Sequence, residues 1–227
     1  MVWNLAPQTI ALVGGTGNQG PPLAVRWALA GNRVLIGSRR LEKARRVAGG
    51  LEETLRRLGC EVEVGFGVNE DVVVEADTVV FTIPYRGLDA TLTALEDRIK
   101  PGTLVISPIV PIEFKGREIR LIHVEDDSAA ETIARRLPQA RVIAALHTVS
   151  ASLLADYARP VKGDVVVCGD DPEARRVGMA LVEEIPNLRA VDGGGLENAH
   201  IIEEFTVLLI KIGRRKRRPD LGIQFTF

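Results

Sequence analysis

Short apolar runs bounded by glycine, proline or polar residues recur along the first two thirds of the chain. Runs of this length and composition are typical of strands that are buried in a parallel sheet. Glutamate and valine alternate at residues 61–64, which predicts a further strand with one solvated face. The buried strands that we predict lie at residues 9–13, 34–36, 78–83, 104–106 and 142–145.

Helical periodicity separates several of these runs. Apolar residues recur at every third or fourth position across residues 41–58, which is the period of an amphipathic helix. Pro21 suits the first turn of a helix that we predict at residues 21–30, because that turn needs no intrahelical N–H donor. Ser128 and Glu131 match a capping box, so we predict that another helix begins there.

The alternation of strands and helices predicts an α/β fold. The expected architecture is a Rossmann-type, doubly wound parallel sheet with helices on both faces. After about residue 147 the pattern continues in shorter form, with elements predicted at residues 165–167, 172–184, 188–191 and 196–212. We interpret residues 1–146 as a dinucleotide-binding domain and residues 147–227 as a smaller C-terminal α/β lobe.

Composition and charge narrow the class of protein. Apolar residues make up 46% of the 227 residues and charged residues 26%, which is typical of globular proteins. The 30 acidic and 29 basic residues nearly cancel, so we expect no nucleic-acid partner. Cys60 and Cys168 form neither a disulfide framework nor a metal-binding pattern. No apolar run could span a membrane and no basic export region opens the chain, so we expect a cytoplasmic protein.

A G-x-G-x-x-G pattern follows the first predicted strand and precedes the first predicted helix. Its residues are Gly15, Thr16, Gly17, Asn18, Gln19 and Gly20. In dinucleotide-binding folds the first glycine permits the tight turn, the second lets a pyrophosphate approach the backbone, and the third allows the helix to pack on the strand. The pattern therefore predicts a pyrophosphate site at residues 15–19. The alternative is a glycine-rich turn that binds no ligand.

The end of the second predicted strand indicates which dinucleotide binds. An NAD-binding chain has an acidic residue there, which holds the ribose hydroxyls. This chain has Ser38 and Arg39 instead, with Lys43 one helical turn later. A hydroxyl and two cations suit the 2′-phosphate of NADP(H), and no carboxylate is present to repel it. The alternative is that these cations only cover the exposed start of a helix.

This chain lacks the catalytic residues on which several classes of oxidoreductase depend. No tyrosine is followed four residues later by lysine, because Asp89 follows Tyr85 and Val161 follows Tyr157. The histidines are isolated, and neither cysteine belongs to a redox pair. Carbonyl reduction needs a proton donor, whereas hydride transfer between two planar cofactors mainly needs face-to-face positioning. The sequence favours the second chemistry, and we name no catalytic acid or base.

Seven short motifs occur in order along nearly the whole chain. They are GGTGN at residues 14–18, GSRR at 37–40, TIP at 82–84, SPIVP at 107–111, ALHT at 145–148, CGDD at 168–171 and LGI at 221–223. Together they resemble the reduced-deazaflavin:NADP oxidoreductases of archaea, whose deazaflavin is coenzyme F420. The resemblance implies a two-lobed homodimer that transfers a hydride between the nicotinamide C4 of NADP(H) and the C5 atom of F420.

The resemblance also implies roles for individual residues. It assigns the pyrophosphate to residues 16–19 and the 2′-phosphate to Ser38, Arg39 and Lys43. By the same resemblance, the nucleotide cleft would be lined by Ile83, Pro84 and Tyr85. The nicotinamide would be flanked by Val110 and Ala151. Those that would shape the deazaflavin pocket are Ser107, Pro108, His147 and Val149. His147 has an alternative interpretation as a structural histidine at a domain junction.

The chain departs from this family at three places, and these departures concern the second substrate. Pro21 and Pro22 open the first helix, Tyr85 and Arg86 replace a usual Trp-Glu pair, and residues 197–200 differ from the common pattern. An NADPH-dependent flavin or ferric reductase and a non-catalytic NADP-binding redox sensor therefore remain alternatives. The basic run at residues 214–218 is either a solvated helix end or a charge that attracts the phosphate and glutamate tail of F420.

Overall fold

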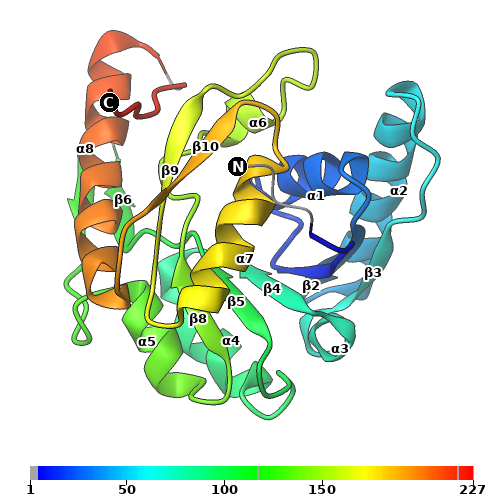
Figure 1. Ribbon diagram of the computed structural model, residues 1–227, viewed down its shortest axis with the longest axis horizontal. Helices are drawn as coiled ribbons and strands as arrows, with labels where there is room; N and C mark the ends of the chain where they lie inside the picture. Colours follow the sequence, from blue (N-terminus) through cyan, green and yellow to red (C-terminus); the bar gives the residue numbers. More distant parts are fainter. Residues whose placement is uncertain (1–4, 117, 219, 227) are drawn as a thin grey trace.

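An eight-stranded sheet runs through the molecule in the computed structural model (Figure 1), which describes residues 5–116, 118–218 and 220–226. In chain order its strands are β1 (Thr9–Val13), β2 (Arg33–Ser38), β3 (Gly65–Val68), β4 (Thr78–Phe81), β5 (Leu104–Ser107), β8 (Arg141–Ala144), β9 (Gly163–Gly169) and β10 (Leu188–Asp192). Their order across the sheet is β10-β9-β8-β5-β4-β1-β2-β3. The six strands from β3 to β8 in this order are parallel, so the predicted Rossmann-type sheet is confirmed.

Helices cover both faces of the sheet. They are α1 (Gly20–Leu29), α2 (Leu41–Arg57), α3 (Asn69–Glu75), α4 (Leu88–Leu95), α5 (Ala129–Arg136), α6 (Ala151–Leu154), α7 (Pro172–Glu183) and α8 (Ala199–Lys216), with single 3₁₀ turns at η1 (Tyr85–Gly87) and η2 (Leu196–Asn198). One apolar core joins the sheet to α1, α2 and α7, and a second joins the other face to α3, α4 and α5. The capping box is confirmed, because Ser128 Oγ accepts the N–H of Glu131 at 3.0 Å. None of the described helices is long and apolar enough to cross a membrane.

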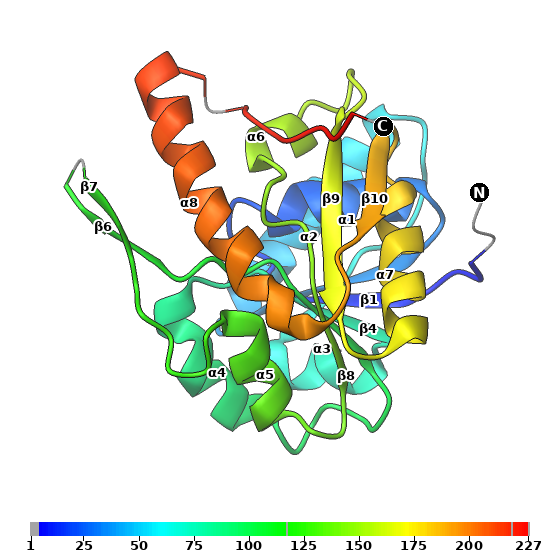
Figure 2. The same ribbon diagram turned by 60° about the vertical axis from the view of Figure 1, so that its left-hand side comes forward.

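Strand β9 reverses the direction of the sheet, which corrects the expectation of parallel strands throughout. It pairs antiparallel with β8 through Ile143 to Gly169 and Ala144 to Cys168. Residues 163–167 pair with β10 instead, so they project beyond the end of β8, as Figure 2 shows. A parallel return needs a crossover connection across one face of the sheet, which is usually a helix. The connection between β8 and β9 contains only the short helix α6, so the chain turns back at the same edge.

The third strand lies later in the chain than the sequence predicts. Residues 61–64 are not in a strand, and β3 begins at Gly65, which pairs with Leu35 of β2. A side chain at residue 65 would collide with the side chain of Leu35. The strand is therefore built where glycine allows close approach, and its glycines hide it from an analysis of apolar alternation. The antiparallel hairpin of β6 (Ile112–Lys115) and β7 (Glu118–Leu121) also has no counterpart among the predicted elements.

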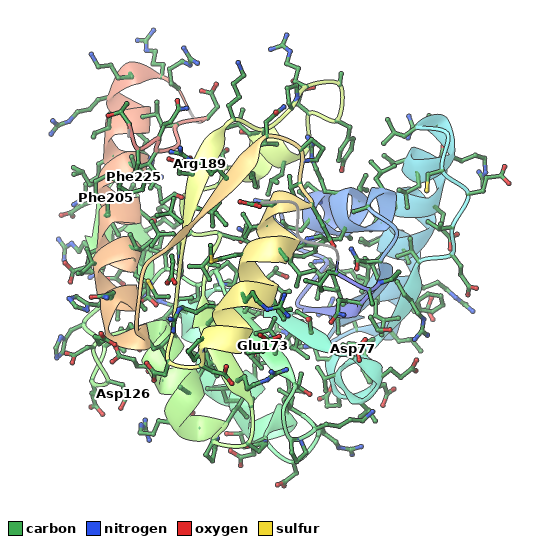
Figure 3. All side chains as sticks on the ribbon, in the orientation of Figure 1. Asp77, Asp126, Glu173, Arg189, Phe205 and Phe225 are labelled. Atoms are coloured by element: carbon green, nitrogen blue, oxygen red, sulfur yellow. The ribbon has the colours of Figure 1, made fainter. Side chains whose placement is uncertain are left out.

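The C-terminal part of the chain is joined to the rest by polar contacts as well as by the shared sheet. Arg189 of β10 forms an ion pair with Asp164 of β9 and donates a hydrogen bond of 2.7 Å to the carbonyl oxygen of Phe225 (Figure 3). The Arg189 guanidinium holds the pKa of Asp164 below its ordinary value. Residues 163–192 thus extend one continuous sheet. A division of the chain at residue 146 stays a prediction.

Candidate functional site

The carboxyl ends of the parallel strands bring most of the predicted site residues to one edge of the sheet. The glycine loop follows β1, Ser38 ends β2, Ile83 follows β4 and Ser107 ends β5. The strand order reverses direction at β1, which lies between β2 and β4. Ligands of open α/β sheets bind in the crevice at such a switch point. Residues that are far apart in the sequence therefore lie around one crevice.

The glycine positions of the loop differ in what excludes a side chain. A Cβ atom on Gly15 would lie 2.8 Å from the carbonyl oxygen of Leu12, and one on Gly20 would lie 2.6 Å from the Cα atom of Gly15. Close packing within the protein therefore requires glycine at both positions. A Cβ atom on Gly17 would have its nearest neighbour at 3.6 Å, and Gly17 is exposed. Contacts among the described residues do not require a glycine at position 17, so a ligand is the better reason for it.

Backbone N–H groups of the loop are available as donors. Those of Thr16, Asn18 and Gln19 have no backbone acceptor in the described part of the chain. Pro21 and Pro22 lie in the first turn of α1 and carry no N–H group. Because these prolines remove donors that a helix N-terminus usually offers, an anion here would depend on the loop itself.

Cationic side chains surround the end of β2. Ser38 is buried, and its Oγ accepts the backbone N–H of Arg40 at 3.2 Å. Arg39 and Lys43 are exposed, and neither forms an ion pair with another described residue. Arg40 precedes α2 and provides no side-chain cap for the free N–H groups of that helix. The geometry suits a phosphate group at this position.

Asn69 is a structural member of the site that the sequence analysis missed. Its side-chain Oδ1 accepts the N–H of Gly14 at 3.1 Å, and a Cβ atom on Gly37 would lie 2.8 Å from the same oxygen. Asn69 is the first residue of α3 and is buried. It therefore fixes the turn after β1 from the end of β3, which lies two strands away in the sheet. A polar residue at the start of a helix directly after a strand is the signal that would have found it.

Gln19 connects the glycine loop to the segment after β8. Its side-chain Nε2 donates a hydrogen bond of 3.3 Å to the carbonyl oxygen of Leu146. Leu146 has a left-handed backbone conformation, with φ of 68°. The next residue is His147, so the glycine loop and His147 lie on two segments that this hydrogen bond joins.

His147 is buried without a hydrogen-bond partner. Only 7% of the residue is exposed, and neither ring nitrogen has a partner among the described residues. Burial lowers the pKa of the imidazole to about 3, so it is neutral near pH 7. The Oγ of Ser107, at the end of β5, is also buried and unpartnered. Buried polar groups without partners are rare in proteins and point to a ligand or a bound water.

His147 lies in the wall of a cavity of about 500 Å³. The cavity separates the loop after β8 from the C-terminal half of α8, and Val149 also lines it. The structure therefore brings His147 and Val149 together in one cavity. Ser107, Pro108, Val110 and Ala151 do not line it. Ser107 and Pro108 are buried nearby in the fold, since β5 pairs with β8, whereas Val110 and Ala151 are half-buried.

The segment after β4 faces α8. Tyr85 is half-buried, and burial raises the pKa of its hydroxyl, with the negative charges of Glu203 and Asp126 raising it further. Ile83 packs against the apolar core, and Pro84 is exposed.

Within the described residues, no group of three or more histidine, cysteine or acidic side chains could hold a metal ion.

Comparison with known proteins identifies relatives of this chain. Residues 9–111 match the family model described as NADP oxidoreductase, coenzyme F420-dependent. The F420-dependent NADP reductase of Methanothermobacter thermautotrophicus is 41% identical over 221 residues, which are 96% of this chain and 94% of that protein. The enzyme of the same name from Methanocaldococcus jannaschii is 36% identical and covers 96% of this chain and 97% of its own length.

A solved structure supports the same relationship. A protein from Arthrobacter sp. FB24 that is assigned as an F420-dependent NADP-reductase superposes with a TM-score of 0.82 at 26% identity. The match covers 97% of this chain and 100% of that one. The chain is an α/β oxidoreductase and belongs to the family of F420-dependent NADP oxidoreductases.

Proposed function

We propose that this protein transfers a hydride between NADP(H) and the deazaflavin coenzyme F420. The observation that carries the proposal is the hydrogen bond from Gln19 to Leu146, which joins the glycine loop to the cavity of His147. The dinucleotide site therefore adjoins a second cavity, which His147 lines. Two planar substrates that must meet face to face need this arrangement.

The residues around the crevice fit NADP(H). The donors of Thr16, Asn18 and Gln19, together with the open approach at Gly17, would hold the pyrophosphate. The 2′-phosphate would be bound by Ser38, Arg39 and Lys43. The nucleotide cleft would be lined by Ile83, Pro84 and Tyr85. Bound NADPH supplies the hydride. The protein's part is to fix the dinucleotide in one orientation.

The second half of the site would hold the deazaflavin ring. His147 and Val149 in the cavity, with Ser107 and Pro108 beneath, are the residues that we assign to it. A neutral imidazole offers one hydrogen-bond donor and one acceptor, which suits an uncharged polar ring edge better than an anion. Val110 and Ala151 would flank the nicotinamide. Residues 147–227 would thus complete the cleft that residues 1–146 begin.

This chemistry balances without a catalytic acid or base from the protein. NADPH loses a hydride and becomes NADP⁺, and oxidised F420 gains that hydride together with one proton from water. The electron pair that the hydride brings is delocalised over the conjugated deazaflavin ring, so it does not build up on a single oxygen beside which the protein must place an acid. Positioning, and exclusion of water by the apolar wall of the cavity, are therefore the protein's main contributions.

We also propose that the protein is a cytoplasmic homodimer that pairs through α8. An exposed apolar stripe runs along this helix, formed by Ile201, Phe205, Leu208 and Ile212. Their spacing of four, three and four residues matches the seam of a helix pair. Glu204 lies near one end of the stripe and Arg215 near the other, so antiparallel pairing of two copies would oppose unlike charges.

Cys60 and Cys168 are free, which suits a reducing compartment such as the cytoplasm.

Anaerobic mixing of the purified protein with NADPH and oxidised F420 tests the proposed reaction. Loss of the visible absorbance of the oxidised deazaflavin, with one NADPH consumed for each F420, is the expected result. Activity only with flavin or ferric chelates would instead identify a flavin or ferric reductase. Binding of NADPH without its oxidation by any of these acceptors would identify a redox sensor and contradict the proposal.

A further inference from the structure

Arg26 is a buried arginine to which the proposed reaction assigns no part. It lies in the last turn of α1, about 9 Å along the helix axis from Gly20, and only 5% of the residue is exposed. Among the described residues it forms no ion pair, and the carboxylate of Asp156 pairs with Arg159 at 3.6 Å instead. An arginine is rarely buried without a partner for its charge. The burial of Arg26 therefore needs another explanation.

The guanidinium of Arg26 donates hydrogen bonds to three backbone carbonyl groups. Its Nε donates to the oxygen of Leu154 at 3.0 Å. Its Nη2 donates to the oxygens of Asp156 and Arg159 at 2.9 and 3.2 Å. The guanidinium carbon also lies 5.6 Å from the centre of the Tyr157 ring, where the negative face of the ring attracts a cation. All these partners belong to one short stretch of the connection between β8 and β9.

This stretch of the connection has little regular structure of its own. Helix α6 is a single turn that ends at Leu154, and one turn of helix is unstable in isolation. The last carbonyl groups of a helix need partners from outside it, and Arg26 supplies a donor to Leu154. The N–H of Arg159 bonds to the carbonyl oxygen of Asp156 at 3.2 Å, and Arg26 donates to both of these residues. Arg26 thus fixes the end of α6, and the turn after it, to α1.

The start of the same connection is also attached to α1. Gln19, which directly precedes the first residue of that helix, donates its hydrogen bond to the carbonyl oxygen of Leu146. Ala151 is the first residue of α6 and lies between the two attachments, and the proposed function places it against the nicotinamide. The loop that would bind the pyrophosphate of a dinucleotide and the segment that would flank its nicotinamide therefore share one support, helix α1.

We propose, on the basis of the proposed function, that Arg26 is a positioning residue for hydride transfer. By holding the end of α6, it fixes Ala151 relative to the glycine loop, and Ala151 sets how the nicotinamide of bound NADP(H) faces the acceptor. Because Arg26 is buried, it acts through α6 rather than by contact with a substrate. Reacting atoms must approach to about 3–3.5 Å, and a misplacement of about 1 Å can slow a reaction about a hundredfold. Loss of the three hydrogen bonds should therefore slow transfer more than it weakens binding.

Single-turnover kinetics under anaerobic conditions tests this assignment. Protein saturated with NADPH is mixed in excess with oxidised F420, and the loss of deazaflavin absorbance gives a rate constant. At saturating protein this limiting rate constant does not depend on the fraction of molecules that is folded. Arg26→Met keeps a long unbranched side chain without donors, and its limiting rate constant should fall by about tenfold or more. Its dissociation constant for NADPH should change by less, because the proposed phosphate contacts remain.

Trp27→Phe is the matched control for loss of stability. It removes a buried hydrogen bond from the neighbouring residue of α1, but the acceptor is Leu181 of α7, outside the connection between β8 and β9. This variant should keep the native limiting rate constant although it is less stable. A native rate constant in Arg26→Met, or an equal loss in both variants, would overturn the positioning role.

Two further measurements keep the test decisive. If Arg26→Met does not fold, Arg26→Lys decides, because an ammonium keeps the charge but cannot reproduce the fork of donors. A reduced limiting rate constant is expected for Arg26→Lys, and a native value would overturn the assignment. Hydrogen exchange of residues 154–159, followed by mass spectrometry, should be faster in the Arg26 variant than in Trp27→Phe, and equal exchange would overturn it too. Failure of the native protein to transfer a hydride from NADPH to F420 would instead refute the proposed function itself.

Discussion

The indole Nε1 of Trp27 donates a hydrogen bond of 2.9 Å to the carbonyl oxygen of Leu181. Trp27 lies on α1, the helix that follows the glycine loop, and Leu181 lies on α7, so the contact ties this helix to the C-terminal part of the chain. Both residues are fully buried in one apolar core. The helix that carries the glycine loop therefore depends on residues that follow the site in sequence.

Replacing Trp27 with Phe should destabilise the whole chain in one cooperative step. The carbonyl oxygen of Leu181 would lose its donor in a dry environment, which costs about 1–3 kcal/mol of unfolding free energy. Urea unfolding followed by far-UV and by near-UV circular dichroism measures it. Coincident single transitions are expected in both proteins. Two separate transitions would show instead that residues 147–227 unfold independently.

Replacing Arg39 with Ala should weaken NADPH more than NADH. The exposed guanidinium lies beside Ser38 at the end of β2, where only NADP(H) carries a phosphate. The ratio of KM for NADPH to KM for NADH should rise by about tenfold or more. Arg46→Ala is the control, because Arg46 is exposed further along α2. Equal changes with both dinucleotides would contradict the 2′-phosphate assignment.

Replacing His147 with Leu should make the protein less sensitive to acid. Burial lowers the pKa of His147 to about 3 in the folded state, while the unfolded chain binds the proton near pH 6.5. The unfolding free energy of the native protein therefore decreases as the pH falls from 6.5 towards 3. The variant lacks the part of this decrease that comes from His147. The difference should reach about 3 kcal/mol near pH 4.5. Urea unfolding near pH 7.5 and pH 4.5 measures it, with His123→Leu, at an exposed position, as the control.

Glu203 should impose the opposite pH dependence. Its carboxylate accepts the N–H groups of Ala129 and Ala130 at 2.9 and 3.2 Å, and burial raises its pKa to about 7. The folded state thus keeps a proton that the unfolded chain releases near pH 4.5, so stability falls as the pH rises from 4.5 to 7. The Glu203→Gln variant should lack this loss of about 3 kcal/mol. An unchanged slope of unfolding free energy against pH would contradict the shift.

Replacing Phe205 with Glu should break the proposed dimer. Phe205 lies in the middle of the exposed stripe of α8 (Figure 3), where antiparallel pairing would bury two carboxylates against apolar side chains. Sedimentation or light scattering should give a dimer for the native protein and a monomer for the variant. Val74→Glu places the same charge at an exposed apolar position on α3 and should stay dimeric. A native protein that is monomeric would refute the pairing.

The parts of this molecule that local sequence determines could be predicted. The glycine loop, the amphipathic helix after β2 and the Ser128 cap depend on neighbours within one or two turns, and the structure has all three. Parallel pairing then brings the strand ends together. Other features depend on distant contacts: the reversal of β9 and the role of Asn69, which acts through Gly14. The burial of His147 and the position of α8 across the cavity from it are likewise tertiary properties.

The overhang of β9 and β10 beyond β8 has a mechanical consequence. Strands β8, β9 and β10 are hydrogen-bonded into the same sheet, so the C-terminal strands cannot rotate as a separate body without breaking strand pairs. Enzymes that close two domains around their substrates couple turnover to that slow motion. Here such a rotation would break the pairing of β8 with β9, so loops, side chains and helix α8 are left to admit one substrate and release the other.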